Sequence, residues 1–458
     1  MKKMQKRAII CLFFAVLLVA GTAFYIGKLA VNGGDWVSYP ANQHIYTNNK
    51  ITTGVILDRN GDTLISNSKD GETQYNSDTS TREALVHVTG DSLGNIATGA
   101  NVVFKDKMVG YNFITGVYSA SGEGRTINLT VDANISKVAG EALGNRSGTV
   151  GVYNYETGEI ICMVSSPNYD PYDPPQLDAD DTSGTYLNRF TSSSIVPGST
   201  FKVITSMAAI ETVSDLDDWT YTCTGSEQYG SYSGDRITCL YPHGTVNFEE
   251  ALAESCNCAF GELANKVGAE NLKKYTEMAG LTSSYDINGI NTRPGSFEFS
   301  DNDLDLAWTG IGQSKDLVNP CSMMIFMGAI ANGGKSAEPY IIDRVRFANG
   351  LPASFPIKHK TETLINEDTA AKLTEMLKNN VESNYGTYNF PGLDIAAKSG
   401  TAEHGEGTTP HAWFTGFLDD PDHPYAFVVV VENGGYGTET AGSVANEVLQ
   451  AIVKQDDN

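Results

Sequence analysis

An uncharged apolar run near the N-terminus limits where this chain can lie and how it can fold. The run AIICLFFAVLLVAGTAFYI occupies residues 8–26 and contains no Asp, Glu, Lys or Arg. This length matches the roughly 20 apolar residues that cross a bilayer as one helix. It is preceded by four cations: Lys2, Lys3, Lys6 and Arg7. Because cations stay on the cytoplasmic side, residues 1–27 are expected to form a cytoplasmic tip and a single-pass membrane anchor, with the remaining chain outside the cytoplasm. The alternative is a signal peptide cleaved near Gly21.

Length and charge narrow the possibilities for the rest of the chain. A chain of 458 residues is too long for one ordinary hydrophobic core, so two or more domains are expected. The net charge of −24 argues against nucleic acid as a partner, because phosphate binding requires a basic face. Residues 28–125 contain short apolar runs among Gly, Asn, Thr and Ser, and they predict a small β-rich pedestal module. Within it, DRNG at residues 58–61 predicts a hairpin turn.

Residues 126–458 predict a second, larger domain of the α+β class. Strand-like runs open it, among them TVGVYNYETGEIICMVSSP, which indicates two strands joined by a tight turn. Helical patterns such as FKVITSMAAIETV fill the middle, and three strand-like runs and a helical run, GSVANEVLQAIV, close the chain. This order favours one antiparallel sheet flanked by helices, with strands from both ends of the domain.

The first candidate catalytic pair is Ser199 and Lys202, in PGSTFK. Residues three apart share one face of a helix, so the lysine amine is placed to reach the serine hydroxyl. Apolar neighbours predict that burial lowers the lysine pKa from about 10.4 to near 7, which makes a general base for an attacking serine. The same spacing occurs at Ser66 and Lys69, but there it lies in a polar turn and is interpreted as solvated surface.

The second candidate is the pair Ser255 and Asn257, at the end of the helical run NFEEALAES. The hydroxyl is suited to relaying a proton, and the amide to holding a peptide group. Taken alone, Ser255 fits a helix cap equally well. The spacing also recurs at Ser166 with Asn168 and at Ser300 with Asn302, in loop-like sequence.

The third candidate is the strand-like run KSGTAE. Lys398 would supply a fixed cation, and Ser399 and Thr401 would supply hydroxyls, a set that suits a substrate carboxylate. Gly400 has no side chain, so another backbone is able to approach this strand, and an extended peptide could add to it as a further strand.

The cysteines outside the anchor do not decide whether a disulfide forms, and they argue against a metal site. Cys223 and Cys239 flank a polar loop, and a bridge between them would contribute roughly 3 kcal/mol. Cys256 and Cys258 form a C-x-C with no second pair and no nearby histidine cluster, so no metal ligands and no cofactor are expected.

The order S-x-x-K, S-x-N, K-S-G is the combination of serine β-lactamases and penicillin-binding proteins. The chain resembles a monofunctional class B penicillin-binding protein with a short N-terminal module. The resemblance rests on these motifs and on runs that include GVILDRNGDTLIS, VPGSTFKVIT, GIGQ and KSGTAEH…HAWFTGF. It implies a penicillin-binding, β-lactamase-like transpeptidase domain on the pedestal module.

The resemblance also implies a reaction and a role for each residue. Ser199 would form an acyl-enzyme with the stem peptides of peptidoglycan or with β-lactams, Lys202 would be the base and Ser255 the proton shuttle. Asn257, Lys398, Ser399, Gly400 and Thr401 would bind the substrate. A membrane glycan polymerase of the SEDS type is the implied partner. A D,D-carboxypeptidase, a β-lactam-hydrolysing or β-lactam-sensing protein, and an inactive scaffold are the alternatives.

Overall fold

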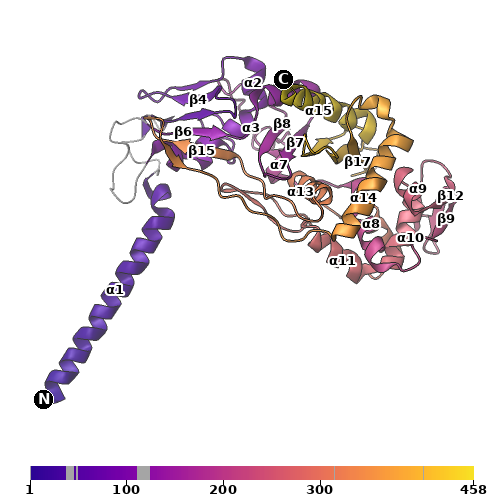
Figure 1. Ribbon diagram of the computed structural model, residues 1–458, viewed down its shortest axis with the longest axis horizontal. Coiled ribbons are helices and arrows are strands. Elements are labelled where there is room, and N and C mark those ends of the chain that lie inside the picture. Colours follow the sequence, from indigo (N-terminus) through magenta and orange to yellow (C-terminus); the bar gives the residue numbers. More distant parts are fainter. Residues whose placement is uncertain are drawn as a thin grey trace.

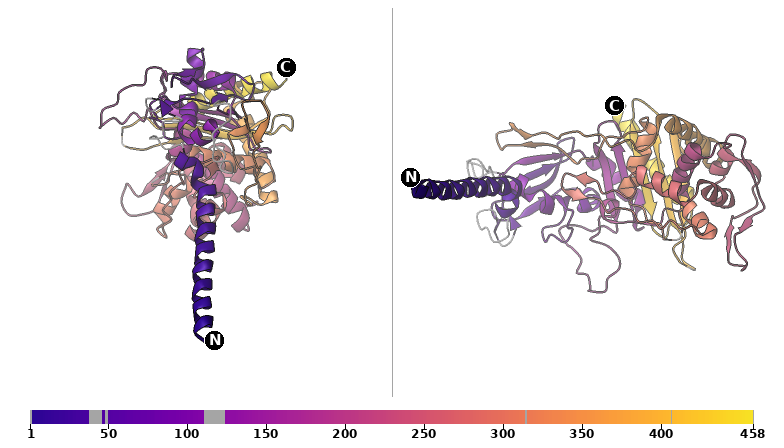
Figure 2. Two further views of the ribbon diagram at one scale, coloured as in Figure 1. Left: turned by 90° about the vertical axis from the view of Figure 1, so that its left-hand side faces the viewer. Right: turned by 90° about the horizontal axis from the view of Figure 1, so that it is seen from below.

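The computed structural model describes residues 2–37, 46–47, 50–110, 124–313, 315–405 and 407–457. Parts of the predicted pedestal module, residues 38–45, 48–49 and 111–123, lie outside the described residues. The N-terminal helix α1 (Lys2–Val37) leads away from the rest of the chain (Figures 1 and 2). Its segment Lys3–Leu29 is long and apolar enough to cross a membrane. Its apolar side chains are exposed, with Leu18 at 72%, which indicates an apolar environment around this helix.

A five-stranded antiparallel sheet forms the centre of the larger domain. The strand order is β17-β18-β19-β7-β8, so strands from the two ends of the domain lie side by side, as the sequence predicts. The strands are β7 (Gly148–Asn154), β8 (Ile160–Ser166), β17 (Ile395–Ala402), β18 (His411–Leu418) and β19 (Tyr425–Val431).

The sheet has a hydrophobic core on each face. Successive side chains of a strand point to opposite faces, and in β19 they divide between the two cores. Phe427 and Val429 join the core made with α6 (Ala133–Leu143) and α15 (Ser443–Asp456). Val428 and Val430 join the other core, which contains the apolar side chains of α13 (Pro320–Ala331). The sheet is therefore buried on both faces, and its run of valines follows from that burial.

A mainly helical lobe lies beyond α13 and carries two of the three motifs. Helix α8 packs against α10 and α11, and small two-stranded hairpins lie at the outer end of the lobe (Figure 1). Asn247 and Glu250 form a capping box that fixes the start of α9. The lobe contains η1 (Gly198–Phe201), α8 (Lys202–Thr212), α9 (Phe248–Ala253), α10 (Asn257–Val267), α11 (Ala269–Met278) and α12 (Asp303–Gly310). The helices α7 (Arg189–Ser192), α14 (Glu367–Asn380), η2 (Val381–Tyr385) and η4 (Gly437–Gly442) contact the strands of the five-stranded sheet, and η3 (Thr387–Asn389) follows η2. The strands at this outer end are β9 (Thr220–Cys223), β10 (Ser226–Gln228), β11 (Arg236–Thr238) and β12 (Gly244–Asn247). Strands β13 (Asp286–Ile287) and β14 (Ile290–Asn291) pair with each other elsewhere, where Asn288 between them accepts hydrogen bonds from the Ile341 and Ile342 backbone N–H groups.

A second sheet, next to α1, has the order β16-β15-β6-β3-β4-β5. Strands β3 and β4 pair antiparallel around the predicted DRNG turn, which confirms that hairpin. Three of the strands follow residue 125, so a boundary at residue 126 would divide this sheet, and the domain limits remain a prediction. The strands are β3 (Val55–Leu57), β4 (Thr63–Asn67), β5 (Thr73–Tyr75), β6 (Thr126–Leu129), β15 (Ile342–Arg346) and β16 (Pro352–Ser354), and β1 (Tyr46–Thr47) pairs with β2 (Lys50–Ile51) nearby in the chain.

Four short helices also lie in the N-terminal module, where the sequence predicts mainly strands. Each is at most six residues long, too short to show helical periodicity in the sequence. Asp78 caps the first of them by accepting a hydrogen bond from the Thr81 backbone N–H. The four are α2 (Thr79–Ala84), α3 (Val86–Thr89), α4 (Ala100–Val103) and α5 (Lys105–Val109).

Candidate active site

The three motifs meet in one cleft between the helical lobe and the edge of the five-stranded sheet. Strand β17 packs against η1, and the α9–α10 junction closes the cleft beside them. The cleft has a volume of about 320 Å³. Five of the predicted site residues line it: Ser199, Ser255, Asn257, Ser399 and Thr401.

The first motif begins at a tight backbone contact. Gly198 has a φ of +54°, and a Cβ at this position would come within 2.7 Å of the Thr401 carbonyl oxygen, so only glycine fits. Ser199 follows within the single turn η1, and Lys202 opens α8. This turn therefore holds the serine against β17, at the mouth of a helix that is otherwise buried.

The lysine of the first motif is fully buried and is bonded to the second motif. The Lys202 ammonium donates hydrogen bonds to Ser255 O (2.6 Å), Ser255 Oγ (3.1 Å) and Asn257 Oδ1 (2.7 Å). Its Nζ also lies 5.6 Å from the centre of the Phe260 ring. Within residues 124–313 and 315–405, no hydrogen bond joins Ser199 to Lys202. Catalytic hydrogen bonds are often loose until a substrate is bound, so this arrangement is compatible with Lys202 as the base.

Ser255 lies between the two lysines of the site. It has a φ of +53°, in the left-handed region, where a non-glycine residue is rarely found. This conformation interrupts the helical backbone between α9 and α10 and turns the hydroxyl toward the lysines. Ser255 Oγ accepts hydrogen bonds from Lys202 Nζ and from Lys398 Nζ, each at 3.1 Å. A hydroxyl held between two amines is well placed to pass a proton between them.

Burial lowers the pKa of both lysines to about 7, from an ordinary value of 10.5. Desolvation is the main cause for both lysines, and the positive charge of Lys398 adds to it for Lys202. Because the repulsion between two positive charges is mutual, loss of a proton from one lysine favours a charge on the other. The pair therefore provides one neutral amine and one cation at neutral pH.

The third motif lies on β17, the edge strand of the sheet. Its residues alternate between two environments: Ser399 and Thr401 are half-buried at the cleft, and Lys398 and Gly400 are buried. The space at Gly400 is taken up by the chain itself, since a Cβ there would lie 2.9 Å from the Pro197 carbonyl oxygen. The glycine thus lets η1 approach β17, where the sequence suggested the approach of another backbone.

Tyr385 is a site residue that no sequence motif indicates. It ends the π-helical turn η2 and lines the cleft. Its hydroxyl oxygen lies 3.3 Å from Lys398 Nζ, and it accepts hydrogen bonds from the backbone N–H (3.0 Å) and Oγ (3.1 Å) of Ser399. Tyr385 therefore holds the third motif through contacts with both Lys398 and Ser399.

The other copies of the motif spacings lie away from this cleft. Lys69 is exposed in the turn after β4. Asn302 caps α12 by accepting hydrogen bonds from the backbone N–H groups of Leu304 and Asp305. Neither these residues nor Ser66 and Ser166 are among those that line the cleft. The fold thus brings one set of the motifs together and leaves the repeats of their spacing elsewhere.

Comparison with known proteins assigns the chain to a family. Residues 148–454 match the family model described as the penicillin binding protein transpeptidase domain. The chain belongs to this family. The matched segment includes all three motifs and every strand of the five-stranded sheet.

Curated relatives and solved structures agree with this assignment. The chain is 29% identical over 372 residues to the peptidoglycan D,D-transpeptidase PbpA of Mycobacterium tuberculosis, covering 75% of this chain and 74% of the relative. It is 28% identical over 367 residues to stage V sporulation protein D of Bacillus subtilis, covering 74% of this chain and 54% of that protein. The imipenem acyl-enzyme of penicillin-binding protein A from M. tuberculosis superposes with a TM-score of 0.77 at 26% identity, covering 88% of this chain and 98% of that one.

Proposed function

We propose that this family member is a peptidoglycan D,D-transpeptidase that works through an acyl-enzyme on Ser199 and is inhibited by β-lactams. The observation that carries the proposal is the position of Ser255 Oγ, 3.1 Å from both Lys202 Nζ and Lys398 Nζ, in the cleft that Ser199 lines. Relatives named as peptidoglycan D,D-transpeptidases, and acyl-enzyme structures of a similar protein, support the same chemistry.

In the first half of the reaction, neutral Lys202 removes the proton of the Ser199 hydroxyl as its oxygen attacks the carbonyl of the penultimate D-alanine. The Ser199–acyl ester bond forms, the peptide bond breaks, and the terminal D-alanine leaves as an amine. Ser255 carries the proton from Lys202 to that amine, because its hydroxyl contacts Lys202 Nζ. The backbone N–H groups of Ser199 and Thr401 stabilise the oxyanion, at about 3 kcal/mol for each donor.

The substrate is held by β17 and the α9–α10 junction. The hydroxyls of Ser399 and Thr401, with the Lys398 cation behind them, bind the terminal carboxylate. The position of β17 at the edge of its sheet suits an extended stem peptide paired as an added strand, with Asn257 holding its backbone. In the second half of the reaction, an amine of a neighbouring stem peptide attacks the ester, Ser199 regains its proton, and a cross-link forms.

We further propose that α1 crosses the cell membrane and places this domain on the outer side. The charge-free run with cations before it supports that orientation. A SEDS-type glycan polymerase in the same membrane is the partner that the family resemblance implies, and we propose it here.

The test uses purified protein in detergent with a stem pentapeptide and an added amine acceptor. Transpeptidation predicts release of D-alanine together with a product joined to the acceptor, and neither should form with Ser199→Ala. Free tetrapeptide as the main product would indicate a D,D-carboxypeptidase instead. Rapid release of penicilloate after incubation with penicillin would indicate a β-lactam-hydrolysing enzyme.

A further inference from the structure

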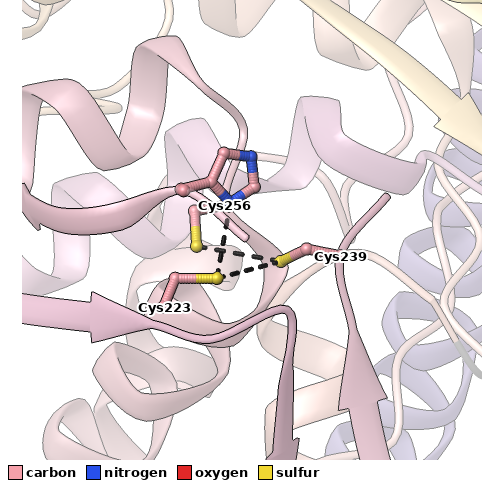
Figure 3. A group of neighbouring side chains, drawn as sticks. Cys223, Cys239 and Cys256 are labelled. Carbon is pink, nitrogen blue, oxygen red and sulfur yellow. Dashed lines mark hydrogen bonds between the residues drawn. The ribbon is translucent and has the colours of Figure 1, made fainter. Parts of the chain in front are cut away.

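Four sulfur and nitrogen ligands converge beside the active-site cleft, at a place where the family assignment gives no reason for them. The ligand atoms of Cys223, Cys239, His243 and Cys256 all lie within 4.8 Å of one another. Figure 3 shows the sulfur atoms of the three cysteines pointing toward a common centre. The four residues come from the end of β9, the segment after β11, the segment before β12 and the N-cap of α10.

The spacing of these atoms fits a tetrahedral metal site. Cys239 Sγ lies 3.8 Å from Cys223 Sγ and 3.8 Å from Cys256 Sγ, and Cys223 Sγ lies 3.4 Å from His243 Nδ1. A zinc ion with sulfur ligands at about 2.3 Å and a nitrogen ligand at about 2.0 Å requires edges of roughly 3.8 Å between sulfurs and roughly 3.5 Å from sulfur to nitrogen. Three of the edges are therefore already close to the lengths that Zn²⁺ requires.

We propose that Cys223, Cys239, His243 and Cys256 bind one Zn²⁺ ion in a tetrahedral Cys₃His site. Three thiols and an imidazole form a closed ligand set of the kind used in structural zinc sites. Zn²⁺ binding releases the three thiol protons, and the bound ion with its three thiolates has a net charge of −1.

A disulfide explains this arrangement less well. Cys239 Sγ lies almost equally far from three other sulfurs, since Cys258 Sγ is 3.5 Å away in addition to those of Cys223 and Cys256. A disulfide would join one of these pairs and would not explain why His243 also lies against these sulfurs. Cys258 Sγ also contacts the Ile237 carbonyl oxygen at 3.7 Å and does not belong to the four-residue group.

An ion at this position would have a structural role. Cys256 lies between Ser255 and Asn257, so a metal bound there would tie the second catalytic motif to the hairpins of the helical lobe. Asn257 already donates a hydrogen bond to the Thr238 carbonyl oxygen at 2.9 Å, next to Cys239. Cys223 and Cys256 are buried, whereas Cys239 and His243 line the cleft, which provides a path for the ion to enter.

The sequence does not indicate this site, because the spacing of its ligands does not match that of a zinc finger. One C-x-C without a second pair or a histidine cluster suggests no metal, and His243 becomes a ligand only because β9 pairs with β12.

The test measures zinc in the purified full-length chain after dialysis against metal-free buffer. We expect about one zinc per chain for the wild type and at least a fivefold lower ratio for Cys223→Ser and for His243→Ala. Cys321→Ala is the matched control, because Cys321 is also a buried cysteine but lies in α13, outside the group. Zinc-free wild type, a metal other than zinc, or an unchanged ratio in both ligand variants would overturn the proposal.

Two measurements on the wild type keep the test independent of whether the variants fold. Thiol titration of the denatured protein should find all seven cysteines free, whereas five would show a disulfide and overturn the site. Replacement of zinc by Co²⁺ should give the intense charge-transfer and visible bands of tetrahedral cobalt thiolate. Weak bands of octahedral cobalt would contradict the Cys₃His assignment.

Discussion

The rate at which penicillin acylates Ser199 should depend steeply on pH, because the proposed base is a buried lysine. The pKa of Lys202 is lowered to about 7. At pH 7 about half of the molecules then have a neutral amine at this position, against about one in 3,000 for an ordinary lysine. Burial thus increases the amount of active base about a thousandfold at neutral pH.

The expected profile follows from the same titration. Lowering the pH from 7 to 5 reduces the neutral fraction of Lys202 from about one half to about one hundredth, so the second-order rate constant should fall about 50-fold. Lys202→Arg cannot lose its proton in this range, and its acylation rate should be at least 100-fold lower than wild type at pH 7. The assay follows a fluorescent penicillin by stopped flow, and circular dichroism checks that the protein stays folded at pH 5.

Lys69→Ala provides the matched control, since Lys69 belongs to the other S-x-x-K copy and is exposed. This variant should reproduce the wild-type profile at every pH. A wild-type rate that stays constant between pH 5 and 7, or a Lys202→Arg variant that acylates normally, would refute the assignment of Lys202 as the base.

Three further predictions concern Tyr385, Gly400 and Lys202. Tyr385→Phe removes the hydroxyl that holds Ser399 and contacts Lys398, so acylation measured by stopped flow should slow by about tenfold. Circular dichroism should show an unchanged fold, and an unchanged acylation rate would exclude this positioning role. Gly400→Ala places a Cβ 2.9 Å from the Pro197 carbonyl oxygen, and it should push η1 from β17 and lower acylation at least tenfold; normal acylation would show that the contact relaxes freely. The folded-state pKa of Lys202 lies below its unfolded value, so the unfolded chain binds more protons between pH 7 and 10.5. The stability of the wild type relative to Lys202→Met should therefore rise with pH in this range, by up to about 1.4 kcal/mol per pH unit. Urea unfolding at pH 7 and 9 measures this difference, and a constant value would contradict the prediction.

The main sheet could be predicted from the sequence because its signals are local. The two strands around the ETGE turn and the valine run of β19 have the length and composition of buried strands, and the structure places them next to each other. The short helices of the N-terminal module could not be predicted in this way, because one or two turns show no period and depend on tertiary packing.

Only the residues of the three motifs could be predicted as parts of the site. Burial of Lys202 follows from its apolar neighbours, and its lowered pKa follows from that burial. The role of Tyr385 depends on the π-helical turn that ends α14, and the grouping of Cys223 with His243 depends on strand pairing across a loop. Contacts of this kind are set by the fold, so no pattern along the chain indicates them.

Mass spectrometry can show whether Ser199 is the nucleophile, because it locates the residue that carries a penicillin adduct. Trypsin should release residues 190–202 as one peptide, since it cleaves after Arg189 and Lys202. This peptide contains Ser199 and also Ser194, whose hydroxyl contacts the Pro294 carbonyl oxygen and which therefore serves as a control. We expect one adduct per chain, fragment ions that place it on Ser199, its loss in Ser199→Ala and its retention in Ser194→Ala. An adduct on any other residue, or one that persists in Ser199→Ala, would exclude Ser199 as the nucleophile.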